Sequence, residues 1–300
     1  MQFASLTELN TLHVARRLRM MGSTIMTALM LSTLSHTTQA NTEATAPHMT
    51  VKLISNHTQV THEQMVKGGS FLAGIEFIPE EDWHIYWRNP GDTGLAPKIQ
   101  WSSTPSFSFG EIQWPIPEEI NVAHLTDYGM HGSTLLFSHI NETQPLDSQQ
   151  TNITINAKVS WLVCKESCIP GEADLQLSLP IGANPIVNNT TATQFQTAQA
   201  KIPVAMPTLS KTATIENGAL SIDVFANSLL FNKAKKVEIF IEESNLVHNG
   251  PPVDISWRAN RFHWKQKLGE YFNKAPDTLH AVIVIDQQYG YALEIPLTAP

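Results

Sequence analysis

Hydrophobic and polar residues alternate with a period of two along much of the chain between Thr50 and Leu179. Such alternation, rich in β-branched and aromatic residues, is typical of strands that bury one face. Clusters of Gly, Pro and Asn separate the segments and no helical pattern alternates with them, which favours an antiparallel sandwich over a parallel sheet. The expected strands are TVKLIS (50–55), FLAGIEFI (71–78), WHIYW (83–87), TLLFSHI (134–140), NITINAKVSWL (152–162) and ADLQLSL (173–179).

A second series of strands is expected after a change of composition. The chain becomes rich in Asn, Thr, Ala, Gln and Pro, and here TATQFQTAQAKI (191–202) has a helical pattern that Pro203 ends. We therefore expect an all-β protein with a first sandwich over 41–182, a linker with a short helix over 183–207, and a second small sandwich over 208–300. The strands expected in the second sandwich are ALSIDVFA (219–226), KVEIFIEE (236–243), RFHWKQ (261–266), HAVIVID (280–286) and YALEIPL (291–297).

The aromatic strand WHIYW divides into two faces because successive side chains of a strand point to opposite sides. The face expected to join the core carries Trp83, Ile85 and Trp87, and a turn at Pro-Gly-Asp follows. The opposite face, expected to contribute to a binding surface, carries His84, Tyr86 and Arg88.

The spacing of the expected strands is irregular, and the long stretch from Asn89 to Gly132 between two of them contains several Pro and Gly residues. We interpret it as an irregular excursion from the sandwich. Within it, LTDYGMHG (125–132) places Tyr128 and His131 beside two glycines. We interpret this segment as a surface loop, with a mobile cap over a site as the alternative.

The first forty residues have the pattern of an export signal. Arg16, Arg17 and Arg19 precede the apolar run MGSTIMTALMLSTL, and small and polar residues follow up to Ala40. The run holds about 14 residues, fewer than the roughly 20 that a membrane-spanning helix needs. We expect a cleaved signal peptide over 1–40 and a soluble, exported chain, with a single N-terminal anchor as the alternative.

The charge and the motifs exclude several classes of function. The formal net charge is −8, and without residues 1–40, which carry three Arg and one Glu, 16 basic and 26 acidic side chains leave −10. This acidity argues against nucleic acid and anionic membranes as partners. The sequence has no GxSxG, HExxH or P-loop pattern, so hydrolase and nucleotide-binding functions have no support.

The only two cysteines, Cys164 and Cys168, lie in WLVCKESCIPG (161–171), where a loop is expected to join two strands. In an exported chain such a pair fits a structural disulfide, a redox dithiol or a metal clip. A ring of about five residues stabilises by only roughly 2 kcal/mol, against about 4.7 kcal/mol for a hundred-residue loop, so a structural staple gains little here. The charge of Lys165 would favour a thiolate, whereas Glu166 would oppose it. No histidine follows a HxxxH or CxxH pattern near the pair, so copper(I) on two thiolates is the remaining metal alternative.

Four motifs, in the same order, resemble the periplasmic N-terminal region of the DsbD/ScsB-type thiol:disulfide interchange proteins. They are WHIYWRNPGDTGLAP (83–97), IQWPIPE (112–118), DYGMHG (127–132) and WLVCKESCIPGEADLQLSLP (161–180). The resemblance covers roughly residues 50–180. The linker helix and the second sandwich are similar, less specifically, to the two-domain N-terminal portion of the ScsB-like branch. The resemblance implies an immunoglobulin-like fold.

The resemblance also implies which residues act. Cys164 and Cys168 become a redox pair that cycles between dithiol and disulfide and needs no dissociable cofactor, and by analogy Cys168 attacks while Cys164 resolves. A capping segment protects the cysteines in the family. The residues expected to cap or line the site here are Asp127, Tyr128, Gly129, Met130, His131, Lys165 and Glu166.

The family further implies partners. In it a membrane domain reduces this exported domain, which then reduces periplasmic oxidoreductases for disulfide isomerisation, cytochrome c maturation or copper-stress defence. This sequence shows no membrane domain and no thioredoxin-like domain, so we expect a separate membrane thiol reductase as donor and thioredoxin-like oxidoreductases as acceptors. The cysteine spacing is closer than in the best-known DsbD domains and matches the ScsB-like branch. The alternative is a non-enzymatic exported module that binds copper or a protein and holds a structural disulfide.

Overall fold

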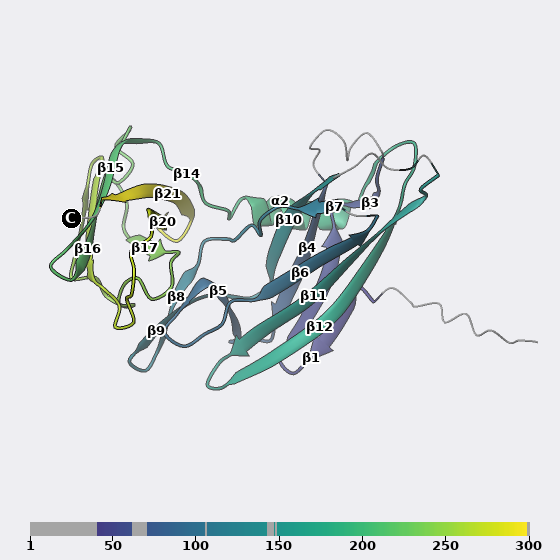
Figure 1. Ribbon diagram of the computed structural model, residues 1–300, viewed down its shortest axis with the longest axis horizontal. Coiled ribbons are helices and arrows are strands. Elements are labelled where there is room, and N and C mark those ends of the chain that lie inside the picture. The colour runs from purple at the N-terminus through teal and green to yellow at the C-terminus, as the bar shows by residue number, and fades with distance from the viewer. Residues whose placement is uncertain (1–40, 62–70, 106, 143–146, 148, 299–300) are drawn as a thin grey trace, which may run out of the picture. The chain divides into compact units, whose positions relative to one another are not determined.

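The structure, a computed structural model, is almost entirely β (Figure 1) and describes residues 41–61, 71–105, 107–142, 147 and 149–298. The predicted signal peptide, residues 1–40, lies outside the described residues. In the described part of the chain, no helix is long and apolar enough to cross a membrane. The expected all-β, immunoglobulin-like fold class is confirmed.

The first sheet has five strands, and each neighbouring pair is antiparallel. In β2, every second residue is buried, including Val51 and Leu53, because the strand covers the core with one face only. This burial explains why TVKLIS predicts the strand. The order is β1 (Glu43–Ala46), β2 (Met49–Ser55), β4 (Leu72–Pro79), β10 (Thr134–Glu142) and β7 (Phe107–Phe109).

The second sheet contains the two longest strands, which form a hairpin of 13 residues on each side. The order is β12 (Cys168–Pro180), β11 (Asn152–Cys164), β5 (His84–Gly91), β9 (Leu125–His131) and β8 (Glu118–Val122), and β6 (Lys98–Thr104) also pairs with β11. A short ribbon joins β3 (His57–Gln59) to β13 (Ile186–Val187). Apolar residues of both large sheets form one core, to which β4 contributes Ile75 and Phe77 and β5 contributes Ile85 and Trp87.

The prediction of an irregular excursion over residues 89–132 is wrong. This stretch holds β6, β7, β8 and β9 as well as the end of β5. Two of these strands are edge strands: β7 lies at the edge of the first sheet and β8 at the edge of the second. Four of the five residues of β8 are exposed. A strand exposed on both faces needs no hydrophobic alternation, so its sequence gives no strand signal.

The helix α2 (Asn189–Gln199) lies close to the predicted range of 191–202. Asn188 caps it, since its side chain accepts a hydrogen bond from the Thr191 backbone N–H at 3.4 Å. Phe195 packs edge-on against Phe137 of β10, with ring centroids 5.7 Å apart. The helix thereby covers an apolar patch of β4 and β10 outside the main core.

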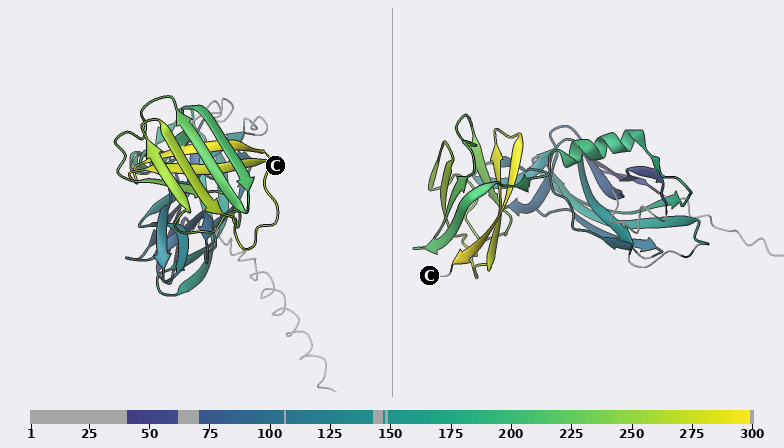
Figure 2. Two further views of the ribbon diagram at one scale, coloured as in Figure 1. Left: turned by 90° about the vertical axis from the view of Figure 1, so that its left-hand side faces the viewer. Right: turned by 90° about the horizontal axis from the view of Figure 1, so that it is seen from above.

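The second group of strands forms a continuous sheet whose two halves enclose a second core (Figure 2). The five expected strands are present, and β14, β15 and β18 were not predicted. The pairs β14–β21 and β15–β21 are parallel, and the others are antiparallel. The order is β17 (Val237–Ile241), β20 (Thr278–Ile285), β21 (Tyr289–Thr298), β15 (Thr208–Glu216), β16 (Ala219–Ala226), β19 (Arg261–Lys267) and β18 (Asp254–Arg258), with β14 (Val204–Ala205) beside β21.

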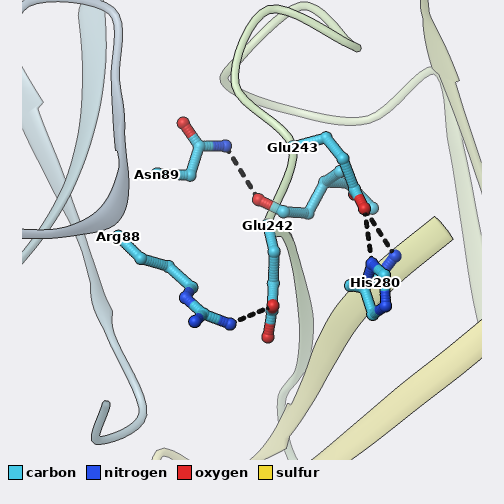
Figure 3. A network of polar contacts seen from close by, with 6 residues as sticks. Arg88, Asn89, Glu242, Glu243 and His280 are labelled. Atoms are coloured by element: carbon cyan, nitrogen blue, oxygen red, sulfur yellow. Dashed lines mark hydrogen bonds and ion pairs between the residues drawn. The ribbon is translucent and has the colours of Figure 1, made fainter. Parts of the chain in front are cut away.

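The C-terminal end of β5 makes polar contacts with the end of β17 (Figure 3). The Arg88 guanidinium forms an ion pair with the Glu242 carboxylate. The Asn89 side-chain amide, in a residue only 2% exposed, donates to the Ile241 carbonyl at 2.7 Å. Both polar side chains at this end of β5 are therefore paired.

Apolar contacts accompany this pairing. Phe240 of β17 is 2% exposed and meets Trp87 and Tyr128 edge-on, with centroid distances of 6.2 and 5.2 Å. Val282 and Val284 of β20 belong to the same apolar cluster as the first core. The β17–β20 face thus contributes to the burial of β5 and β9.

Candidate functional site

The two cysteines face each other across the end of the β11–β12 hairpin. Cys164 is the last residue of β11 and Cys168 the first of β12, and the hairpin register pairs them directly. They form a disulfide with a Cα–Cα distance of 4.2 Å. Three residues connect them, so the expected loop between two strands is present at this position.

The two sulfur-bearing residues differ in exposure. Cys164 is only 2% exposed, whereas Cys168 is exposed at the hairpin end. A partner therefore has access to Cys168 but not to Cys164. Thiol–disulfide exchange begins with attack at an accessible sulfur, and of the two residues only Cys168 has the exposure that such a step would need.

A row of four side chains crosses the sheet on the face that carries the cysteines. The register pairs Cys168 with Cys164, Cys164 with His84, and His84 with His131. Directly opposite residues of neighbouring strands place their side chains on the same face. The row runs through β12, β11, β5 and β9, and its middle members are buried.

His84 is the buried imidazole of this row. It is 3% exposed, and its Nε2 has no hydrogen-bond partner among the described residues. Burial first, and then the neighbouring His131, lower the pKa of His84 to about 4. The imidazole is therefore neutral at pH 7.

Tyr86, two residues along β5 on the same face, reaches the exposed cysteine. Its hydroxyl donates to the Sγ of Cys168 at 3.7 Å, and its ring meets the His84 ring edge-on at 5.2 Å. Burial, followed by the Asp127 carboxylate, raises the pKa of Tyr86. The hydroxyl stays protonated and can donate to a thiolate on Cys168.

The segment after β5 covers Tyr86. A Cβ at Gly94 would lie 2.0 Å from the Tyr86 ring, so only glycine allows this approach. Asp127, which is 0% exposed, holds the segment by accepting bonds from the Thr93 N–H at 2.8 Å and the Thr93 hydroxyl at 2.5 Å. The expected binding face of β5 is therefore not open, because His84 and Tyr86 are both buried.

The prediction of a surface loop over 125–132 is wrong, since β9 occupies Leu125–His131. Asp127 and His131 lie on the cysteine face of this strand. Tyr128 and Met130 lie on the other face within the apolar core, and burial raises the pKa of Tyr128 far above its ordinary value. The role of these residues as a cap stays a prediction.

The charged residues beside the cysteines make contacts of their own. Lys165 pairs with Asp82 at 2.9 Å, and this bond raises the pKa of Lys165 and lowers that of Asp82. Glu166 is exposed, and His131 pairs with Glu118 at 3.0 Å. Over the described ranges, no group of three or more His, Cys, Asp or Glu residues is arranged to hold a metal ion.

Three contributors to the site were not expected from the sequence. Thr93 and Gly94 follow the turn predicted at Pro-Gly-Asp, and no sequence pattern gave a reason to assign them a role. His84 was assigned to a binding face rather than to the neighbourhood of the cysteines. A histidine inside an aromatic strand was the available signal, but its partner on β11 is 80 residues away.

Comparison with known proteins agrees with this geometry. Residues 51–180 match the sequence model of the family "Thiol:disulfide interchange protein DsbD, N-terminal". The fold is similar to the crystal structure of the N-terminal periplasmic domain of ScsB from Proteus mirabilis, with a TM-score of 0.64 and 19% identity over 87% of this chain and 99% of that chain. No curated protein matches the chain.

The matched range contains both cysteines and every residue of the row that crosses the sheet. The resemblance found in the four motifs is confirmed, and it supports thiol–disulfide exchange as the general activity. Residues 51–180 are thus recognised as a domain similar to the N-terminal domain of the DsbD-type thiol:disulfide interchange proteins.

Proposed function

We propose that the chain passes electrons to other exported oxidoreductases through a reversible Cys164–Cys168 disulfide. The observation that carries the proposal is the asymmetry of the pair: Cys168 is exposed at the hairpin end, and Cys164 is 2% exposed behind it. Exchange through a dithiol needs one sulfur that a partner can reach and a second that closes the ring.

The reaction starts from the reduced pair. The Cys168 thiolate attacks one sulfur of the partner disulfide, a mixed disulfide forms, and the other partner sulfur leaves as a thiolate. Cys164 then attacks the Cys168 sulfur, the Cys164–Cys168 bond forms, and the remaining partner sulfur leaves. Two electrons have moved to the partner, and no dissociable cofactor takes part.

Tyr86 supports the attacking role of Cys168. Its hydroxyl lies 3.7 Å from the Cys168 sulfur, and a hydrogen bond to a thiolate favours the charged form. Lys165 is paired with Asp82, so its charge is already partly balanced.

The resemblance to the family supports a proposal for the compartment and the partners. We place the chain in the periplasm after removal of residues 1–40, with a separate membrane thiol reductase as electron donor. The acceptors are thioredoxin-like oxidoreductases that serve disulfide isomerisation, cytochrome c maturation or copper-stress defence. The acidic surface of the chain selects among them by charge complementarity.

Trapping of the mixed disulfide tests the proposal. Reduced Cys164→Ser protein, mixed with an oxidised thioredoxin-like oxidoreductase, is expected to accumulate a covalent complex, because the resolving thiol is missing. Reduced Cys168→Ser protein is expected to form little complex, since its remaining thiol is buried. Non-reducing gels and mass spectrometry measure both.

Ser167→Ala is the matched control, because it changes an exposed residue of the same hairpin end and keeps both thiols. It should reduce the oxidoreductase as fast as the unchanged protein. Failure of the unchanged reduced protein to transfer electrons, or equal trapping by both cysteine variants, would contradict the proposal. The first result would favour a binding module with a structural disulfide.

A further inference from the structure

We propose that His84 is the acid–base residue of the buried Cys164 thiol. It accepts the thiol proton when Cys164 closes the disulfide and returns a proton when the disulfide is reduced. This inference rests on the proposed exchange function and adds the group that moves the proton of the inaccessible sulfur.

The register of the sheet places the two residues side by side. His84 of β5 is the direct partner of Cys164 of β11. Cβ atoms of directly opposite residues in an antiparallel pair lie about 4.5–5.5 Å apart, and their side chains share one face. The imidazole and the thiol therefore occupy neighbouring positions.

Because both residues are buried, the Cys164 thiol needs a proton acceptor inside the protein. Cys164 is 2% exposed and His84 is 3% exposed, so bulk water has little access to the thiol proton. The Nε2 of His84 has no hydrogen-bond partner within the part of the chain that the structure describes. Buried polar atoms are normally paired, and an unpaired one marks either a cost to stability or a chemical use.

The surroundings keep His84 in its neutral form, the only form that can accept a proton, and the lowered pKa also makes it a weaker base than an ordinary histidine. Burial contributes most to its lowered pKa, and the nearby His131 of β9 acts in the same direction. The carboxylates of Asp127 on β9 and Glu118 on β8 oppose the shift, and Tyr86 lies at its ring edge. His131, 5.3 Å away between ring centroids and 43% exposed in its side chain, gives the accepted proton a way to solvent.

The step is balanced as follows. In the mixed disulfide, Cys164 carries S–H and Cys168 is bonded to the sulfur of the partner. The thiol proton moves to His84 Nε2 while the Cys164 sulfur attacks the Cys168 sulfur. The Cys164–Cys168 bond forms, the bond from Cys168 to the partner breaks, and the partner sulfur leaves with the electron pair. His84 then releases its proton towards solvent.

A small chromogenic disulfide separates the two steps. Reduced protein treated with one equivalent of 5,5′-dithiobis(2-nitrobenzoate) releases one thionitrobenzoate when Cys168 attacks and a second when Cys164 closes the ring. The second release is unimolecular. For the unchanged protein, its rate is expected to be nearly independent of pH from 6 to 8, because His84 stays neutral there.

His84→Phe keeps a buried ring and removes the base. At pH 7 its second release is expected to be about 100-fold slower, the lower end of the contribution of a positioned acid–base group. The rate should rise about tenfold per pH unit, as closure then depends on the fraction of Cys164 thiolate. His84→Gln is the second variant in case the first does not fold. His57→Phe, a change of another buried histidine, is the control and should leave the flat profile unchanged.

The outcomes distinguish this inference from the exchange function. If no thionitrobenzoate is released in the second step by unchanged protein, the exchange function itself fails. If closure proceeds but a His84 variant keeps both the rate and the flat profile, only the role of His84 fails. A tenfold rise per pH unit in the unchanged protein would also overturn it, whatever the variants do.

Discussion

The two ends of strand β5 differ in whether their polar side chains have hydrogen-bond or ion-pair partners. At the C-terminal end, Arg88 and Asn89 are paired with Glu242 and the Ile241 carbonyl of β17. At the N-terminal end, His84 is buried beside Cys164, and its Nε2 has no hydrogen-bond partner among the residues that the structure describes. Pairing is what a buried polar group needs for stability. The N-terminal end lacks such pairing within the described part of the chain, and it is the end next to the disulfide. There, an imidazole without a hydrogen-bond partner can act as a base.

The comparison also gives the second sandwich a structural role. Its strand β17 supplies the partners of Arg88 and Asn89 and places Phe240 against Trp87 and Tyr128. Since β9 carries both Tyr128 and the buried Asp127, these contacts support the strand that holds Thr93 over Tyr86. The difference between the two ends can be measured by variants at each.

The largest effect is expected for Phe240→Ala. Removing a fully buried aromatic ring costs about 3–5 kcal/mol, through lost burial and the cavity left behind. Urea unfolding measures the loss of unfolding free energy. Phe225→Ala, at a position 36% exposed in the same sandwich, is the control and should cost far less. Equal losses of unfolding free energy for the two variants would contradict the close packing of Phe240 against β5 and β9.

A smaller effect is expected for Asn89→Ala at the paired end of β5. The substitution leaves the Ile241 carbonyl without its donor, and an unsatisfied buried group costs about 1–3 kcal/mol. Asn273→Ala, at an exposed position outside the strands, should stay within about 0.5 kcal/mol of the unchanged protein. An unchanged free energy of unfolding in the Asn89 variant would contradict the claim that pairing at the C-terminal end of β5 stabilises the fold.

The smallest effect belongs to the unpaired end and depends on pH. The pKa of His84 is about 4 in the folded chain and 6.5 for an unperturbed histidine, so the unfolded chain binds more protons between these values. Stability contributed by neutral His84 is complete above pH 6.5 and is lost as the pH falls towards 4. Allowing for solvent screening, the loss is about 1–2 kcal/mol.

Urea unfolding at pH 7 and pH 4.5 checks this expectation. His84→Phe should lose less stability than the unchanged protein over this interval, because a phenyl ring takes up no proton. Burial also lowers the pKa of His57, so some acid sensitivity should remain in the His84 variant. An identical loss in both proteins would contradict a neutral, buried His84.

Sequence pattern predicts many of the strands that bury one face, and it misses β8 and β9 for two different physical reasons. In β2 and β19 every second residue is buried, so the alternation is visible in the sequence. The strand β8 is exposed on both faces, and β9 is buried on both, so neither alternates. Strand β9 was therefore taken for a loop.

The cysteines were identifiable because they are the only two in the chain and lie four positions apart. Their surroundings were not, because these depend on pairing between distant segments. His84 meets Cys164 across 80 residues, and Thr93 meets Asp127 across 34. A register shift of one residue would place His84 on the opposite face, and no local pattern fixes that register.

The reduction potential of the Cys164–Cys168 disulfide tests the central claim most directly. Equilibration of the protein in dithiothreitol or glutathione buffers of known potential, followed by thiol labelling and mass spectrometry, gives the value. A pair that exchanges electrons with other exported oxidoreductases should have a potential above about −300 mV. A value below about −300 mV would identify a structural disulfide and contradict the proposed exchange function.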